Sequence, residues 1–222
     1  MVDLAALKAE NLKRWTLARP LRDFSPAAKR LVNPIAKARY EDVANRTGVP
    51  WFFIAVVHER ESSQDFSRSL AQGDPWNKIS VHVPAGRGPF SSWEAAAIDA
   101  LTNCPPFAAR NGDWSVGGLL TELESYNGFG YAARDLPSPY IWAGTDQYEK
   151  GKFVRDGFFD PNAVDQQFGC AGLLIGMMKL DSSIAGLIGK KPIPAPPVPA
   201  PAAQAGFFAN LLASILAIFR RK

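Results

Sequence analysis

Two carboxylates lie at the end of a strongly apolar segment, where a carboxyl group could serve as a proton donor. Residues 51–57 read Trp-Phe-Phe-Ile-Ala-Val-Val, and Glu59 and Glu61 follow closely. The apolar spacing predicts a helix that is buried on at least one side. A carboxylate at the end of such a helix loses hydration, which raises its pKa and keeps it protonated near neutral pH. The segment therefore predicts a general acid at its end.

The two acids cannot serve the same cleft. Residues two apart on a helix point about 200° away from each other, so only one of Glu59 and Glu61 can face a substrate. The alternative interpretation is a solvated acid at a helix end that pairs with a nearby arginine. The residue types alone leave this choice open.

Other catalytic chemistries lack their motifs. The only histidines are His58 and His82, and the run from His58 has Ser62 where the zinc motif His-Glu-x-x-His needs its second histidine. No serine elbow or phosphate-binding loop occurs in the sequence. Cys104 and Cys170 are too few for a disulfide scaffold, so we expect buried free thiols. We therefore expect no metal and no cofactor.

The remaining pattern predicts a mainly α-helical domain with a small β-hairpin beside the helix that carries the acid. Residues 66–90 change character, with turn formers at 73–75 and a β-prone run at 79–83. An irregular region extends from about 126 to about 160. Helical spacing is predicted over residues 3–16, 26–47, 92–101, 114–125, 161–179 and 182–188.

The composition divides the chain into three parts. Residues 1–189 are sufficient for one catalytic domain with a single core. Residues 190–205 are rich in Pro and Ala and predict a semi-rigid linker. Residues 206–222 form an apolar segment with a cationic end, which is too short to span a bilayer. We expect an amphipathic helix that contacts a membrane surface, and the alternative is a helix docked on protein.

The end of the apolar helix resembles a known catalytic helix. In goose-type lysozymes and soluble lytic transglycosylases the acid directly precedes Ser, as Glu61 precedes Ser62 here. This resemblance selects Glu61 over Glu59. A wider set of short motifs is similar to a lysozyme family of bacteria and phages over about residues 35–180. These motifs are His58-x-Arg60-Glu61-Ser62, Gly73-Asp74-Pro75, Val81-His82-Val83-Pro84-Ala85-Gly86-Arg87, Tyr126-Asn127-Gly128-Phe129-Gly130-Tyr131, Ser138-Pro139-Tyr140-Ile141-Trp142 and Gly151-Lys152-Phe153-Val154.

The resemblance implies a lysozyme-like α+β fold and an N-acetylmuramidase that cleaves the β-1,4 bond between MurNAc and GlcNAc. Glu61 would be the general acid. Asp74 would activate water or stabilise positive charge, and Ser80 would hold the water. Ser80 follows Asp74 at the spacing at which phage-type lysozymes place Thr. The alternative for Asp74 is a turn former before proline.

Several further residues are candidates for binding the glycan. Tyr126-Asn127-Gly128 resembles the Tyr-Asn-Ala-Gly loop that lines the saccharide cleft of lytic transglycosylases, and the alternative is an aromatic turn. Aromatic rings in this region could stack on sugars or belong to the core. The expected substrate-binding residues are Tyr126, Asn127, Tyr131, Tyr140, Trp142, His82 and Arg87.

Two other functions stay open at this point. A lytic transglycosylase would give 1,6-anhydro products, and a catalytically silent protein would be a glycan-binding or membrane-localised scaffold. The net charge of +4 and pI near 9.1 favour anionic polymers such as bacterial envelopes, and no nucleic-acid stripe occurs. The first residues lack the pattern of a cleavable signal. We therefore expect an endolysin that is made in the cytoplasm and acts on peptidoglycan in the host periplasm or cell wall.

Overall fold

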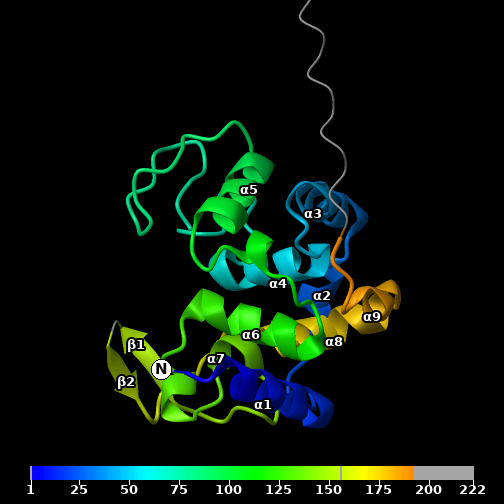
Figure 1. The fold of residues 1–222 in the computed structure, drawn as a ribbon, viewed down its shortest axis with the longest axis vertical. Helices are drawn as coiled ribbons and strands as arrows, with labels where there is room; N and C mark the ends of the chain where they lie inside the picture. Colours follow the sequence, from blue (N-terminus) through cyan, green and yellow to red (C-terminus); the bar gives the residue numbers. More distant parts are fainter. Residues whose placement is uncertain (1, 156, 193–222) are drawn as a thin grey trace, which may run out of the picture.

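The computed structural model describes residues 2–155 and 157–192 and is mainly helical with one small antiparallel sheet, as predicted (Figure 1). The helices are α1 (Leu4–Leu17), α2 (Ser25–Leu31), α3 (Pro34–Thr47), α4 (Trp51–Ser62), α5 (Trp93–Asn103), α6 (Val116–Asn127), α7 (Pro139–Trp142), α8 (Cys170–Leu180) and α9 (Ser183–Leu187). The strands are β1 (Lys152–Arg155) and β2 (Phe158–Asp160), and the 3-10 turns are η1 (Ala108–Arg110) and η2 (Ala132–Arg134).

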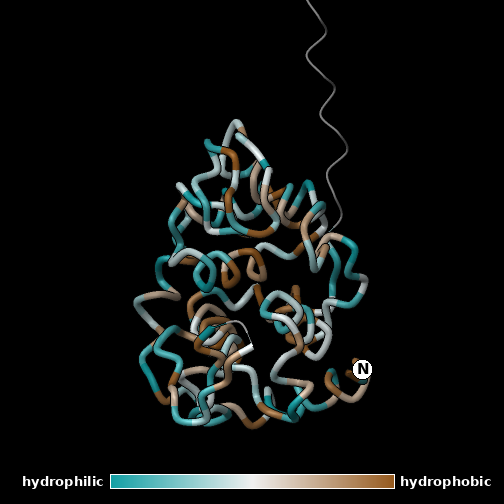
Figure 2. Tube along the Cα trace, turned by 90° about the vertical axis from the view of Figure 1, so that its left-hand side faces the viewer, coloured by the Kyte–Doolittle hydropathy of each residue, from teal (hydrophilic) through white to brown (hydrophobic). Residues whose placement is uncertain are grey.

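Helix α4 is the centre of the structure. It packs against α2, α3, α6 and α8, and every residue from 52 to 57 is at most 1% exposed. Burial of each large apolar side chain contributes about 1.5–3 kcal/mol, so this helix anchors the core. Figure 2 shows hydrophobic segments gathered at the height where Figure 1 places α4, with hydrophilic segments toward the outside.

The prediction of one helix over residues 26–47 is wrong, because the structure has two helices there, α2 and α3. The division lies at Asn33 and Pro34. The Asn33 side chain accepts a hydrogen bond from the Ile35 N–H at 3.0 Å, and Pro34 occupies the first turn of α3. A proline at that position starts a helix readily because its missing donor would be unpaired there anyway.

The hairpin lies elsewhere than predicted. Residues 79–83 form no strand, and Ile79, Val81 and Val83 are 61%, 76% and 87% exposed. A β-prone run becomes a strand only when a partner strand satisfies its backbone, and no strand of the described part of the chain pairs with residues 79–83. The sheet is instead formed by β1 and β2.

The β1–β2 hairpin comes from the region that was expected to be irregular. Its strands pair Lys152 with Asp160 and Phe153 with Phe159, and a bulge follows Phe153. The ring of Tyr131 packs edge-on against Phe153 at 5.0 Å, which attaches the hairpin to the segment after α6.

Most other helices agree with the prediction to within a few residues. The exception is α8, which was expected to begin at 161 and begins at Cys170. The preceding residues are an irregular segment that contains the buried Asp165. The predicted linker 190–205 falls outside the described residues after position 192, and the predicted apolar helix 206–222 does so entirely. No described helix is long and apolar enough to cross a membrane.

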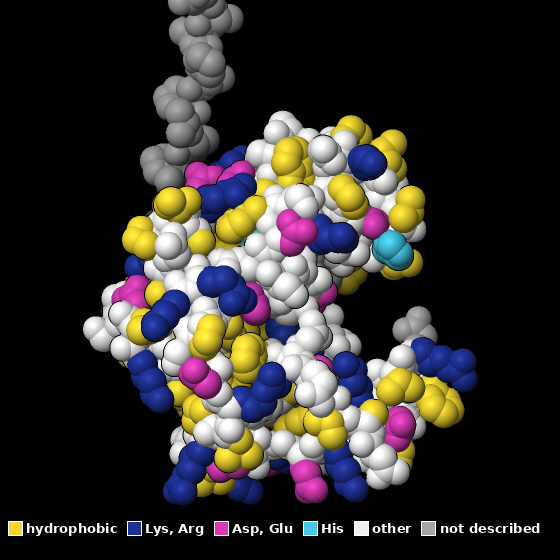
Figure 3. Space-filling view, turned by 180° about the vertical axis from the view of Figure 1, so that it is seen from behind, with side chains coloured by type: hydrophobic (Ala, Val, Ile, Leu, Met, Phe, Trp, Pro, Cys, Tyr) yellow, Lys and Arg dark blue, Asp and Glu magenta, His cyan; other side chains and the backbone are white. Residues whose placement is uncertain are grey.

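Two parts of the chain border the end of α4. We call residues 63–103, which include α5, the loop lobe, and residues 116–160, which include the β1–β2 hairpin, the hairpin lobe. Figure 3 shows a deep notch in the surface between these two lobes. A Cβ added at Gly73 of the loop lobe would lie 3.7 Å from the Glu61 carbonyl oxygen, and Tyr140 of the hairpin lobe contacts the Glu61 side chain. Helix α4 therefore ends where the two lobes meet.

A buried ion pair fixes this end of α4. Arg60 Nη2 lies 3.0 Å from Asp165 Oδ2, and both side chains are at most 5% exposed. We expect Arg60→Met to lower the free energy of unfolding by about 3–5 kcal/mol, because it leaves the Asp165 charge buried with Lys152 alone. Denaturant unfolding measures the loss.

Arg68→Met is the matched control. Arg68 pairs with Asp65 at 3.1 Å, but both side chains are exposed, so the cost should stay below about 1 kcal/mol. Equal losses in the two variants would show that the Arg60 pair does not hold the end of α4.

Candidate active site

Glu61 has the environment of a proton donor. It lies in the last turn of α4, where part of the residue reaches the surface. Loss of hydration raises the pKa of its carboxyl above the ordinary value, while a hydrogen bond from Tyr140 and the charge of Arg60 partly oppose this. The Tyr140 hydroxyl donates to Glu61 Oε1 at 2.8 Å. The carboxyl is therefore held in position in an environment that favours its neutral form.

The three charged residues at the end of α4 point to three different sides. Glu59 Oε1 accepts a hydrogen bond from Arg30 of α2 at 2.8 Å. Arg60 reaches Asp165 before α8, and Glu61 reaches Tyr140 of α7. Successive helical residues are rotated by about 100°, which accounts for this division. The side chain of Glu61, beside α7, has its pKa raised by burial.

The backbone turns sharply directly after the acid. Ser63 and Gln64 both have left-handed conformations, with φ of 54° and 61°. Non-glycine residues adopt this region seldom, and successive examples cluster at functional sites. Gln64 is held in place, because its Nε2 donates to the Tyr40 hydroxyl and to the Arg30 carbonyl, each at 3.1 Å. The turn directs the chain into the loop lobe immediately beside Glu61.

Tyr126 belongs to the same group as Glu61. Its ring packs edge-on against Phe53 of α4 at 5.8 Å, and its hydroxyl is buried without a hydrogen-bond partner. Burial is the largest cause that raises the pKa of Tyr126, and the nearby carboxyls of Glu61 and Glu122 raise it further. The structure therefore brings Glu61, Tyr126 and Tyr140 together, as expected for neighbours in one site.

Glu122 lies near Tyr126 and belongs to the same group, although the sequence pattern did not predict it. It lies one helical turn before Tyr126 on α6, and its Oε1 is buried without a partner. Burial raises the pKa of Glu122 to about 7. The spacing of four residues before Tyr126 was the available signal, because such positions share one face of a helix.

Asp74 is fully engaged within the loop lobe. Its Oδ2 accepts hydrogen bonds from the Val81 and His82 backbone N–H groups at 2.8 and 2.9 Å, and its Oδ1 lies 2.6 Å from His82 Nδ1. The pKa of Asp74 is lowered, and the backbone hydrogen bond from His82 is the largest cause. Asp74 is therefore an ionised anchor for residues 74–82, and the exposed His82 ring completes that anchor.

Ser80 and Arg87 also hold the loop lobe together. The Ser80 hydroxyl donates to the Pro84 carbonyl at 3.1 Å and accepts from the Arg87 N–H at 2.9 Å. The Arg87 guanidinium forms a two-pronged ion pair with Asp99 of α5. These contacts occupy the polar groups that were expected to hold water and to bind the glycan.

The remaining glycan-binding candidates fall in different environments. Asn127 is exposed, whereas Trp142 is fully buried in the core and has no surface for a sugar to stack on. Tyr131 is 4% exposed, and its hydroxyl accepts a hydrogen bond from the Phe153 N–H at 2.9 Å. A cavity of about 430 Å³ lies next to the end of α4, and Arg60, Asn127, Tyr131 and Lys152 contribute to its lining.

Histidine and cysteine have structural positions. His58 is fully buried, burial lowers its pKa to about 4, and its Nδ1 lies 3.0 Å from the Tyr40 hydroxyl. Cys104 and Cys170 are free and buried, as expected. In residues 2–155 and 157–192, no three His, Cys, Asp or Glu side chains are grouped as metal ligands. The chemistry available at the notch is proton transfer by carboxyl and phenol groups.

The chain matches no protein-family model, no curated protein and no solved structure. The resemblance to lysozymes therefore stays a prediction.

Glu122 should make the stability of the protein depend on pH. Its pKa rises from an ordinary 4.5 to about 7 in the folded state, so the unfolded chain releases this proton first as pH increases. The stability contributed by the neutral carboxyl is present below pH 4.5 and lost toward pH 7. We expect Glu122→Gln to be more stable than wild type by roughly 1–2 kcal/mol at pH 8, after allowance for partial exposure, and equal at pH 4.

Urea unfolding at both pH values measures this difference. Glu149→Gln is the control, because Glu149 is exposed and should change stability little at either pH. A Glu122→Gln variant whose advantage does not grow with pH would show that Glu122 is not buried in its neutral form.

Proposed function

We propose that this protein cleaves the glycan strands of peptidoglycan as an N-acetylmuramidase, with Glu61 as the general acid. One observation supports this most strongly: the carboxyl of Glu61 lies at the end of a buried helix, between two lobes, with its pKa raised by loss of hydration. A glycosidic oxygen is a poor leaving group until it is protonated, and a carboxylic acid whose pKa is raised by loss of hydration can supply that proton.

The hydrogen bond from Tyr140 indicates which oxygen of Glu61 donates. The Tyr140 hydroxyl donates to Oε1, so Oε1 acts as an acceptor. The acidic proton then resides on Oε2, which is free to face the substrate. After proton transfer, the same Tyr140 hydroxyl stabilises the carboxylate that forms. Tyr140 is thus a positioning residue for the acid.

The charge beside the site suits an anionic glycan. The cavity of about 430 Å³ next to α4 is lined by Arg60, Lys152 and Arg155 and by a single carboxylate, Asp165. Muramic acid carries a carboxylate on its lactyl group, and cationic side chains attract such groups. The net charge of +4 for the whole chain also favours binding of an anionic glycan.

A lytic transglycosylase is the second candidate, and the environment of Asp74 favours it. Hydrolysis with Asp74 as the base would require this carboxylate to release hydrogen bonds from Val81 or His82. A transglycosylase needs no second carboxylate, because the C6 hydroxyl of the substrate replaces water and the acid later acts as base. Both reactions begin with proton donation by Glu61.

Glu61→Gln should abolish glycan cleavage while the protein stays folded. Loss of the proton donor costs on the order of a hundredfold to ten-thousandfold in kcat. Glu59→Gln is the matched control on the same helix turn, because Glu59 faces Arg30 of α2, and it should keep most of the activity. The rate of release of soluble saccharides from purified peptidoglycan measures both. The reverse pattern would move the acid to position 59.

Mass spectrometry of the same digests separates the candidate functions. Reducing-end muramic acid supports the muramidase, and a 1,6-anhydro end identifies the transglycosylase. Retained saccharide binding by wild type without any cleaved product would identify a glycan-binding scaffold and overturn the proposal.

A further inference from the structure

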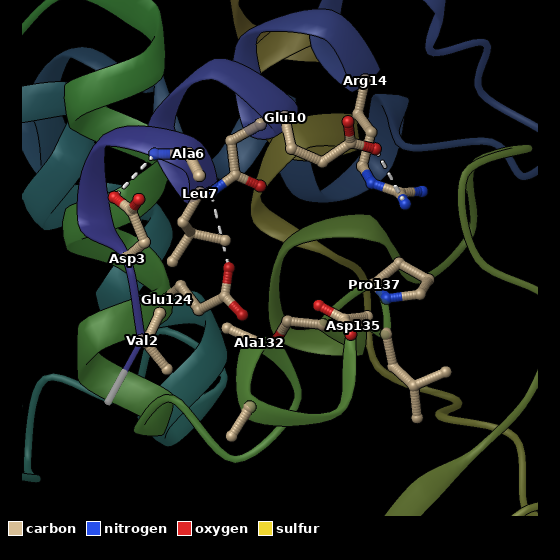
Figure 4. A pocket seen from close by; sticks show the side chains of 14 residues that line it. Val2, Asp3, Ala6, Leu7, Glu10, Arg14, Glu124, Ala132, Asp135 and Pro137 are labelled. Carbon is tan, nitrogen blue, oxygen red and sulfur yellow. Dashed lines mark hydrogen bonds and ion pairs between the residues drawn. The ribbon is translucent and has the colours of Figure 1, made fainter.

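A second cavity lies on the hairpin-lobe side of the molecule, beneath α1. Its volume is about 640 Å³, and it is enclosed by α1, the end of α6 and the segment 132–138 (Figure 4). None of the residues of the candidate active site lines it. The cavity is therefore separate from the notch and from the chemistry proposed there.

Two buried polar atoms of residues that line this cavity, Glu124 Oε1 and Ser138 Oγ, lack hydrogen-bond partners. Glu124 is 2% exposed and its Oε1 makes no hydrogen bond, while Oε2 accepts a long one from Asn11 Nδ2 at 3.4 Å. Figure 4 shows the Glu124 side chain reaching from α6 into the space below α1. Ser138 is 1% exposed, and its Oγ is also without a partner. An unpartnered buried polar group destabilises the fold, so two that share a cavity indicate a ligand with donor hydrogens.

The charge of the lining indicates the sign of that ligand. Four carboxyl groups line the cavity, and a single guanidinium, Arg14, accompanies them. Arg14 is already paired with Glu10 at 3.0 Å. The other carboxyl groups are those of Asp3, Glu124 and Asp135. The cavity is therefore suited to a cation and unsuited to an anion.

The remaining walls are aliphatic. Leu7 extends into the cavity from α1 (Figure 4), and Ala132, Ala133 and Leu136 also line it. Such walls bind methylene groups through loss of apolar surface to water. A ligand that satisfies both features has a hydrocarbon chain and a cationic head with several donor hydrogens.

We propose that this cavity binds a primary alkylammonium group. Its N–H groups would donate to Glu124 Oε1 and Ser138 Oγ, and its methylene chain would lie between Leu7 and Leu136. A lysine side chain on a peptide and a free diamine share this chemistry. The burial of Glu124 raises the pKa of its carboxyl, and a bound ammonium ion would hold it ionised. The proposal is independent of peptidoglycan cleavage.

Isothermal titration calorimetry of the full chain tests the site with 1,5-diaminopentane and with Nα-acetyl-lysine amide. We expect saturable binding of at least one probe, with one site per chain; the stronger probe identifies a free or peptide-borne amine as the ligand. Nα,Nε-diacetyl-lysine amide keeps the chain but lacks the charge, so it should not bind. Glu124→Gln should weaken binding by about tenfold to a hundredfold through loss of a charge-assisted hydrogen bond.

Two further variants make the result decisive. Glu149→Gln removes an exposed carboxylate elsewhere and should leave the affinity unchanged. Ser138→Ala removes the second acceptor and should weaken binding about threefold to tenfold, which decides the matter if circular dichroism shows that Glu124→Gln is unfolded. No saturable binding of either amine to wild type, equal binding of the diacetylated probe, or wild-type affinity in Ser138→Ala and in a folded Glu124→Gln would overturn the proposal.

Discussion

The burial of α4 on every side is the constraint from which the rest of the structure follows. Its apolar residues require neighbours all around, and α2, α3, α6 and α8 supply them. The last turn of such a helix must reach the edge of the core, because its charged residues cannot be enclosed without partners. The position of Glu61 is thus a consequence of the packing of residues 52–57, and its raised pKa follows from the same burial.

Each charged side chain at the end of α4 has a different partner. Glu59 forms an ion pair with Arg30 of α2, and Arg60 forms one with the buried Asp165 before α8. The side chain of Glu61 instead accepts a hydrogen bond from the neutral hydroxyl of Tyr140. The hydrogen bond from Tyr140 and the charge of Arg60 lower the pKa of Glu61, but loss of hydration outweighs both. The contrast between Glu59 and Glu61 is the physical basis for assigning the acid.

The central helix could be predicted from the sequence because its signal is local. Continuous apolar residues followed by charged ones define both its burial and its end. The division of residues 26–47 was missed, although Pro34 after Asn33 is a local signal for a new helix start. The position of the β-hairpin could not be predicted in this way, because a strand depends on a partner strand elsewhere in the sequence. Val81 and Val83 are β-prone but belong to no strand, whereas Phe153 pairs with Phe159 across the β1–β2 hairpin.

The candidate site was predictable only in part, because its contacts also depend on partners that are distant in the sequence. Tyr140 and Trp142 are two residues apart and were equal candidates for the cleft, yet one bonds to Glu61 and the other is wholly in the core. Asp74 and Ser80 have the residue types for chemistry, but their hydrogen bonds are made within the loop lobe. Glu122 is the opposite case, a carboxyl without a motif that the packing of α6 places near Tyr126.

The central claim is that burial at the end of α4 keeps Glu61 protonated, and the pKa of that carboxyl tests it most directly. A ¹³C NMR titration can follow the side-chain carboxyl carbon of Glu61, assigned by its absence from the spectrum of Glu61→Gln. We predict a midpoint above the ordinary 4.5. A midpoint at or below 4.5 would mean that Glu61 is an ionised helix-end acid, and it would contradict the assignment of Glu61 as the proton donor.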